Sequence, residues 1–225
     1  MGIDKHLKGV QKMNERMIIT ISRQFGSGGR NIGKRLAKAL DIPFYDSELI
    51  DEGAKESGIN PEMVRDMEET PTNSLLYSIA TSPFFGTSHF SPTVELPLTD
   101  RLFLAQSEVI RKFAEQGSCV IVGRCANYVL REDPDVVNVF IHRDFDERVN
   151  QVSKLYDLSK KKAEEVIKKT DKKRSNYYAY YSDKHWGQAE NYDLCLDSGK
   201  LGEDNSVSLI VDFIEKYHLR RRIRG

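Results

Sequence analysis

The most informative part of the chain is the stretch MIITISRQFGSGGRNIG, residues 17–33. The apolar, β-branched run at 17–21 is typical of a buried strand, and a turn rich in glycine follows it. Apolar residues then recur with the spacing of one buried helical face, at Ile32, Leu36, Ala37 and Leu40. We therefore predict a strand, a tight turn and a helix in direct succession.

A glycine turn between a strand and a helix is suited to hold a phosphate group. Glycines let several backbone N–H groups converge on one point, and the N-terminus of the following helix adds a partial positive charge. Arg23 and Arg30 add full positive charges beside the glycines. The sequence therefore predicts a phosphate site at this turn.

Two phosphate-binding patterns match the turn, and both matches are incomplete. In the pattern G-x-x-x-x-G-K-[ST], Gly28 takes the second glycine, but Gly29 stands at the lysine and Arg30 at the hydroxyl residue. In the dinucleotide pattern G-x-G-x-x-G, Gly26 and Gly28 fit, whereas Asn31 replaces the third glycine. The turn alone does not decide between the two patterns.

The other residues favour phosphoryl transfer over dinucleotide binding. Asp46 lies at a suitable separation along the chain for the ribose contact of a dinucleotide site. A hydride-transfer enzyme, however, has no need of several arginines at strand ends, whereas phosphoryl transfer has to neutralise crowded negative charge. An NAD-binding oxidoreductase is therefore the weaker alternative.

Strands and helices alternate along the rest of the chain. Further strands are predicted at residues 42–45, 119–122, 136–141 and 193–197. Ser47 is expected to cap one of the intervening helices, and Asp144 with Glu147 to open another. This alternation favours an α/β fold with a mainly parallel five-stranded sheet, helices on both faces and ligands at the carboxyl ends of the strands.

The domain organisation follows from shifts in composition. Residues 1–16 are polar and predict an N-terminal extension, residues 17–219 a single domain, and residues 220–225 a basic tail. Serine, threonine and proline dominate residues 70–100, which we interpret as an insertion. Residues 159–186 combine a lysine-rich helix, by default a solvated face, with an aromatic cluster.

Charge and hydropathy exclude several classes of partner. Lys+Arg 34 balance Asp+Glu 34 in this chain of 225 residues, so no global field would attract nucleic acid or an anionic membrane. No stretch approaches the roughly 18 consecutive apolar residues that a membrane helix needs, and we find no secretory signal. Three cysteines without metal-ligand spacing, Cys119, Cys125 and Cys195, are expected as free thiols. We expect a cytoplasmic protein with neither a membrane nor a nucleic-acid partner.

Four segments resemble the cytidylate-kinase-like proteins, a nucleoside monophosphate kinase branch of the P-loop fold. They are MIITISRQFGSGGRNIGKRLAKAL at 17–40, CVIVGR at 119–124, DKKRSNYY at 171–178 and YDLCLDSGKLG at 192–202. The resemblance runs from about residue 17 to residue 214. It implies a P-loop kinase-like three-layer fold in which 159–186 form a helical lid and 70–100 lie near the acceptor.

The resemblance also implies ATP-dependent phosphoryl transfer to a nucleoside monophosphate or a related small acceptor, with Mg²⁺. The donor phosphates would lie on the glycine turn, at Arg23, Gly26, Ser27, Gly28, Gly29, Arg30 and Asn31. Arg30 would replace the absent lysine. Arg124 would hold the acceptor phosphate, Arg174 would close onto the transferring group, and Asp171 would lie near the acceptor. The acceptor segment would also include Asp46 and Ser47.

Departures from the family pattern leave the acceptor open. Val122 and Cys125 stand where cytidylate kinases have acidic residues, one of which reads the cytosine ring. Asp51 or Glu52 replaces an expected arginine. These changes motivate a second hypothesis, a nucleotide- or phosphate-sensing protein that has lost catalysis.

Simpler structural roles compete with some of these assignments. Arg124 could anchor a loop by pairing with a carboxylate, as arginines after strands often do. The tyrosines of 159–186 could stack on a base, but we favour packing within the chain or across a homodimer. The sequence identifies no metal ligands.

Overall fold

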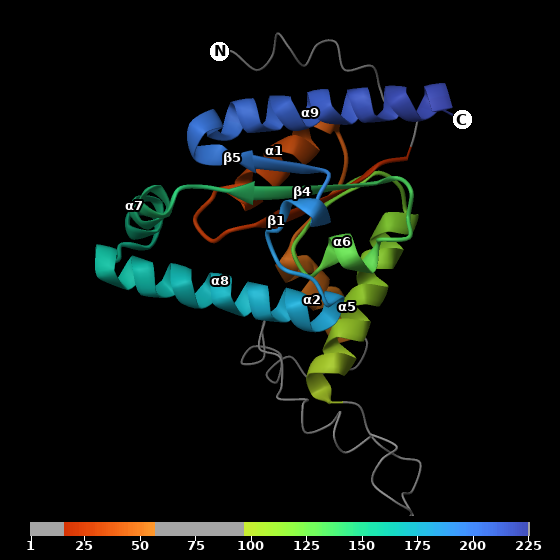
Figure 1. The fold of residues 1–225 in the computed structure, drawn as a ribbon. Coiled ribbons are helices and arrows are strands. Elements are labelled where there is room, and N and C mark those ends of the chain that lie inside the picture. Colours follow the sequence, from red (N-terminus) through yellow and green to blue (C-terminus); the bar gives the residue numbers. More distant parts are fainter. Residues whose placement is uncertain (1–15, 57–96, 225) are drawn as a thin grey trace, which may run out of the picture.

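The computed structural model describes residues 16–56 and 97–224, and its centre is a five-stranded sheet. The strands are β1 (Ile18–Arg23), β2 (Phe44–Tyr45), β3 (Cys119–Val122), β4 (Val136–His142) and β5 (Leu194–Asp197). Their order is β2-β3-β1-β4-β5, and every neighbouring pair is parallel (Figure 1). The predicted parallel α/β sheet is confirmed.

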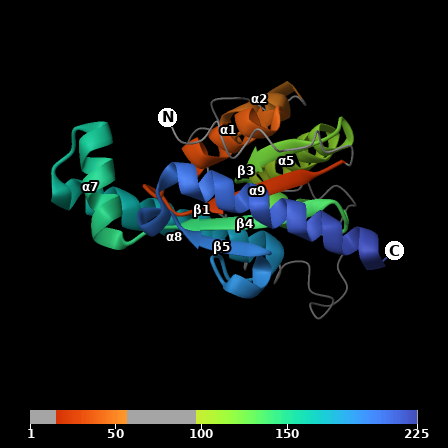
Figure 2. The same ribbon diagram turned by 90° about the horizontal axis from the view of Figure 1, so that it is seen from above.

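Both faces of the sheet are covered, because the buried strand residues alternate between two apolar clusters. Ile19 and Ile21 of β1 pack towards α1 (Gly29–Leu40) and α9 (Ser198–Arg224). Ile18 faces the other side of the sheet and packs with residues of α5 (Leu98–Glu115) and α6 (Ala126–Val129). The helices therefore form an outer layer on each side of the sheet (Figures 1 and 2).

The glycine turn leads from β1 into α1 as predicted. Gly28 precedes the helix in the left-handed conformation, with φ +78°. One turn later, a Cβ on Gly33 would lie 3.0 Å from side-chain atoms of both Ile21 and Val122. Gly33 therefore lets α1 pack closely against the strands and fixes where its N-terminus lies.

Helix α7 (Phe145–Tyr156) lies beyond one end of the sheet, and α8 (Lys160–Ser182) runs from beside α7 back towards α5 and α6 (Figures 1 and 2). The Asp144 carboxylate accepts hydrogen bonds from two N–H groups of the first turn of α7, which confirms the predicted start. The two helices join through a small apolar cluster of Val149, Val152, Ala163 and Ile167.

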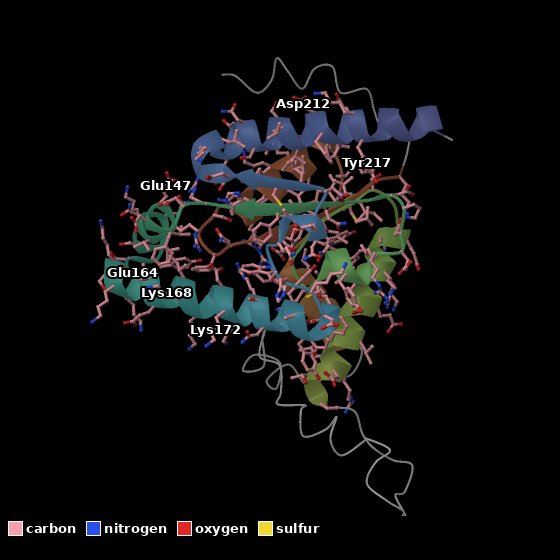
Figure 3. All side chains as sticks on the ribbon, in the orientation of Figure 1. Glu147, Glu164, Lys168, Lys172, Asp212 and Tyr217 are labelled. Atoms are coloured by element: carbon pink, nitrogen blue, oxygen red, sulfur yellow. The ribbon has the colours of Figure 1, made fainter. Side chains whose placement is uncertain are left out.

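The lysine-rich and tyrosine-rich parts of 159–186 form one continuous helix, α8. Glu164, Lys168 and Lys172 lie on its outer side, where Lys168 pairs with Glu164 at 3.3 Å (Figure 3). The lysines are a solvated helix face, the default expectation. Tyr178 is buried on the opposite side, so this helix carries a charged face outward and an aromatic face inward.

Several predicted boundaries shift. Asp46, not Ser47, caps α2 (Ser47–Glu56), because its carboxylate accepts a hydrogen bond of 3.2 Å from the Leu49 N–H. Helix α5 begins at Leu98, inside the stretch assigned to the insertion. Helix α9 has a non-helical residue at Gly202, and its backbone stays helical to Arg224, into the expected tail. Residues 70–96 of the insertion and residues 1–15 lie outside the described residues.

Two expectations from composition can be compared with the described residues. None of the helices placed there combines the length and apolar character needed to cross a membrane. All three cysteines are free thiols, with Cys119 and Cys125 buried. Burial raises the pKa of Cys119 to about 12, so this thiol stays protonated at neutral pH.

Candidate functional site

The glycine turn, residues 23–31, is held in a fixed shape by its own hydrogen bonds. Gly26 and Gly28 have φ values of +79° and +78°, a conformation that favours glycine. The Ser27 hydroxyl donates to the Gln24 carbonyl at 2.8 Å, and the Ser198 hydroxyl donates to the Ser27 carbonyl at 2.6 Å. Ser27 is fully buried, its backbone N–H also donates to the Gln24 carbonyl at 3.3 Å, and it supports the turn from within the protein.

A cavity of about 210 Å³ lies over the turn. Its floor includes Gly26, Gly28, Gly29 and Asn31, and its opposite wall comes from α7. Arginines border it on several sides, namely Arg23, Arg30 and Arg174. The structure therefore brings six of the seven expected donor-site residues to one cavity, at the carboxyl end of β1 and the N-terminus of α1.

Arg30 lines this cavity, but its guanidinium lies on carboxylates. Its Nε donates to Asp46 Oδ2 at 2.9 Å and its Nη2 donates to the same oxygen and to Glu48 at 3.2 Å. The hydrogen bond with Asp46 raises the pKa of Arg30. Asp46, expected to bind the acceptor, is thus already occupied by Arg30, and this geometry disfavours Arg30 as the replacement for the lysine.

The glycine turn is tied to α8 by Asp171. One carboxylate oxygen accepts from the Phe25 N–H at 2.8 Å, and the other accepts from Arg148 Nη1 at 2.6 Å. Arg174, one turn later, donates to the Arg23 carbonyl at 3.1 Å and lies over the Phe25 ring. Asp171 therefore orients the glycine turn, whereas the resemblance had placed it near the acceptor.

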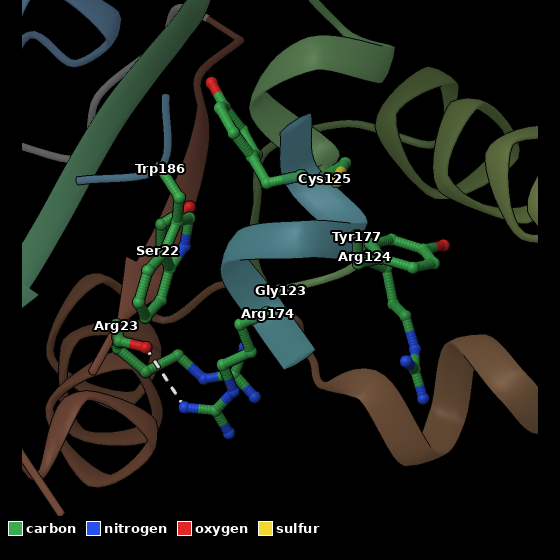
Figure 4. Close-up of a pocket in the computed structure, with 9 residues that line it drawn as sticks. Ser22, Arg23, Gly123, Arg124, Cys125, Arg174, Tyr177 and Trp186 are labelled. Atoms are coloured by element: carbon green, nitrogen blue, oxygen red, sulfur yellow. Dashed lines mark hydrogen bonds between the residues drawn. The ribbon is translucent and has the colours of Figure 1, made fainter. Parts of the chain in front are cut away.

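A second, smaller cavity of about 30 Å³ lies at the carboxyl end of β3. Gly123, Arg124 and Cys125 have three successive positive φ values, of 88°, 52° and 53°. Non-glycine residues rarely adopt this conformation, and such strain is concentrated at functional sites. Figure 4 shows Arg23 and Arg174 converging beside this cavity, while Arg124 points away from them towards α2.

Arg124 belongs to a buried chain of side chains that we call the acceptor-side cluster: Arg124, Asp51, Gln106 and Tyr177. Arg124 Nε donates to Asp51 Oδ1 at 2.9 Å and Nη2 donates to Oδ2. Gln106 donates to Asp51 at 2.8 Å and accepts from the Tyr177 hydroxyl at 2.9 Å. The simpler interpretation of Arg124, a pair with a carboxylate, is the one observed.

The electrostatics of this cluster keep it intact at neutral pH. Only 5% of the Arg124 side chain and 7% of the Asp51 side chain are exposed, so each charge depends on the other. Burial raises the pKa of Tyr177 well above its usual range, so its hydroxyl stays protonated and can donate. Arg124 is therefore already neutralised by the protein at the position assigned to an acceptor phosphate.

Two residues of the site were missed by the sequence analysis. Arg148 is 6% exposed and donates to the Phe25 carbonyl at 3.2 Å, joining the turn to α7. Its signal was a charged residue among the apolar positions of an amphipathic helix, beside Val149 and Val152. Gln106 gave no signal, because its partners are distant in the sequence.

The residues of the turn do not fit a magnesium ion held by the protein. Arg30 stands where the phosphate-loop pattern has a hydroxyl ligand, and its guanidinium already occupies the Asp46 carboxylate. Among residues 16–56 and 97–224, no group of three or more His, Cys, Asp or Glu side chains is placed to hold a metal ion.

Three solved structures illustrate what the chain is similar to. An uncharacterized protein from Eubacterium ventriosum is 30% identical, with a TM-score of 0.67 over 89% of this chain and 99% of that one. A gluconokinase from Sinorhizobium meliloti 1021 has a TM-score of 0.56 at 12% identity, over 93% and 98% of the chains. A shikimate kinase from Bacteroides thetaiotaomicron has a TM-score of 0.53 at 14% identity, over 89% and 99%.

These likenesses confirm the P-loop kinase-like fold. No protein with a curated description matches the sequence. The model of the cytidylate kinase-like family matches residues 18–200, which include both cavities and the glycine turn. The chain therefore belongs to the cytidylate kinase-like family.

Proposed function

We propose that this protein is a kinase that transfers the terminal phosphoryl group of ATP to a small acceptor, such as a nucleoside monophosphate. The observation that carries the proposal is the cavity over the glycine turn, bordered by the N-terminus of α1 and by three arginines. Backbone N–H groups and guanidinium groups are the usual partners of a polyphosphate. The family and the fold independently support a phosphotransferase.

The chemistry would consist of positioning and charge neutralisation. The triphosphate would lie on the turn, with its terminal phosphate towards Arg23 and Arg174, the two residues that border both cavities. Their guanidinium groups would stabilise the charge on the transferring phosphoryl group. Mg²⁺ would accompany ATP from solution, and the acceptor would enter at the carboxyl end of β3.

A screen of acceptors with ATP and Mg²⁺ tests the proposal. It should include nucleoside monophosphates and, because the structural neighbours are named as such kinases, gluconate and shikimate. Arg174→Ala is expected to lower turnover by about 10²–10³-fold in a protein that still folds, as thermal melting would show. Lys172→Ala, on the outer face of the same helix, is the matched control and should keep wild-type turnover. Equal turnover in both variants would contradict the proposed site.

The alternative function, a nucleotide-binding protein without catalysis, has one specific observation in its favour. The arginine assigned to the acceptor phosphate is already neutralised by Asp51. ATP binding by calorimetry without phosphoryl transfer to any acceptor in the screen would favour this alternative.

The sheet order argues against the oxidoreductase hypothesis. A dinucleotide-binding fold places its second strand next to its first, in the order 3-2-1-4. Here β3 lies between β1 and β2. Asp46, the expected ribose contact, is bound to Arg30 instead.

A further inference from the structure

The glycine at position 29, where the phosphate-loop pattern has lysine, is explained by the side chain of Arg23. A Cβ on Gly29 would lie 2.5 Å from the Cβ of Arg23 and 3.0 Å from its Cγ. Gly29 is the first residue of α1 and has no left-handed backbone that would require glycine. Its missing side chain therefore reflects space, and the stem of Arg23 fills that space.

From this position the Arg23 side chain reaches across to the end of β3. A Cβ on Gly123 would overlap Arg23 Nη1 and would lie 3.2 Å from Cζ. The guanidinium therefore lies in the gap between the carboxyl ends of β1 and β3, two paired strands. Glycines at both ends of its path, Gly29 and Gly123, leave room for it.

The same guanidinium stands at the boundary of the two cavities. Arg23 and Arg174 are the residues that border both the cavity over the glycine turn and the cavity at the end of β3. Figure 4 shows the two side chains next to each other, joined by the hydrogen bond from Arg174 to the Arg23 carbonyl. A phosphoryl group passing between the cavities would meet both positive charges.

We infer that Arg23, at the end of β1, supplies the positive charge that the phosphate-loop lysine would supply from the first turn of α1. This inference rests on the proposed function, because it assigns a role at the donor phosphates. A lysine at position 29 of the helix and the arginine at position 23 of the strand would overlap. An arginine at position 23 therefore requires glycine at position 29. Arg30, which the sequence suggested, serves Asp46 instead.

The first test removes the positive charge of Arg23 and compares the effect with the loss of two other charges on the turn and on α1. Arg23→Gln keeps most of the stem and removes the charge, and we expect turnover with Mg²⁺ and ATP to fall by about 10²–10³-fold. Arg30→Gln is expected to lower turnover less than Arg23→Gln does. Lys34→Gln, an exposed residue of α1, is the matched control and should equal the wild type.

A double variant tests this requirement directly. Arg23→Gly opens the space for a side chain at position 29, whereas alanine would not, because the overlap includes the Cβ of residue 23. Arg23→Gly with Gly29→Lys is expected to regain at least tenfold in turnover over Arg23→Gly alone. Calorimetry should likewise show that the double variant binds ATP with Mg²⁺ more tightly than Arg23→Gly does. Thermal melting identifies any variant that fails to fold.

The outcomes separate this inference from the proposed function. If the wild type binds ATP and transfers phosphate while Arg23→Gln stays within twofold of it, the inference is wrong and the proposed function stands. If the wild type neither binds nor hydrolyses ATP, both are overturned. Loss in Arg23→Gln together with rescue in the double variant supports the inference.

Discussion

The glycine turn and the acceptor-side cluster are built in opposite ways. The turn uses backbone groups and short-range contacts, and Arg23, Arg30 and Arg174 stand at the border of an open cavity. The cluster joins side chains from α2, α5, α8 and the end of β3, and its charges are buried and paired with each other. The turn therefore places positive charge at the edge of an open cavity, whereas the cluster encloses its charges as an internal pair.

The largest effect should come from breaking the buried pair. Asp51→Asn removes the carboxylate that pairs with the buried Arg124 guanidinium, so the free energy of unfolding should fall by about 3–5 kcal/mol. Urea denaturation measures it. Glu108→Gln, which removes an exposed carboxylate on α5, is the control and should change stability by less than about 0.5 kcal/mol. A loss below about 1 kcal/mol for Asp51→Asn would show that the cluster does not depend on this charge.

The turn should respond differently to a change in its backbone. Gly26→Ala introduces a left-handed alanine whose Cβ would lie 2.9 Å from Val152, so we expect a loss of about 1–3 kcal/mol in unfolding free energy and weaker ATP binding. Gly202→Ala has a similar φ of +74° but no atom within 4 Å of the new Cβ. It should cost stability without weakening ATP binding. Equal ATP affinities in wild type and Gly26→Ala would separate the turn from nucleotide binding.

A smaller effect should follow the loss of one hydrogen bond in the cluster. Tyr177→Phe removes the hydroxyl that donates to the side-chain oxygen of Gln106, and we expect a decrease of about 1 kcal/mol in unfolding free energy.

The ionisation of Tyr177 also makes the stability of the protein depend on pH. Because burial raises the pKa of Tyr177 above its unfolded value of about 10, its contribution is complete below pH 10 and is lost as pH rises further.

The decline in stability between pH 10 and 12 should therefore be shallower in Tyr177→Phe than in the wild type. Tyr181 and Tyr192, whose pKa values burial also raises, keep part of the slope. Chemical denaturation at a series of fixed pH values measures this slope, and the control Tyr180→Phe should keep the slope of the wild type. An unchanged slope in Tyr177→Phe would contradict the assigned burial of this hydroxyl.

The smallest effect should come from the exposed arginine of the turn. Arg30 is 56% exposed in its side chain, so water screens its charge; Asp46 is only 6% exposed but also accepts from the Leu49 N–H at the start of α2, and this contact would remain without Arg30. Arg30→Met should lower the unfolding free energy by less than about 1 kcal/mol, whereas the same change at the buried Arg124 should cost several times more. Thermal melting of the two methionine variants compares them directly. Similar losses would remove the contrast between the two regions.

The same contrast explains which parts of the site could be predicted from the sequence. The turn was predictable because its strand, glycines and helix are contiguous, and the sheet followed from the alternation of apolar runs. The partner of Arg124 was not, because Asp51 lies 73 residues away. Asp171 was assigned to the acceptor, but its partner Phe25 lies on the glycine turn, 146 residues away. Contacts over such separations leave no local pattern.

The hydrogen bond between Asp171 and the Phe25 N–H also has a consequence for biosynthesis. The ribosome completes the glycine motif well before it adds Asp171, because the carboxylate that holds the backbone of the motif follows Phe25 by 146 residues. A nascent chain that stops short of α8 would carry the complete motif without one of the restraints on its shape. The turn is therefore expected to reach its final shape only after α8 has docked on it.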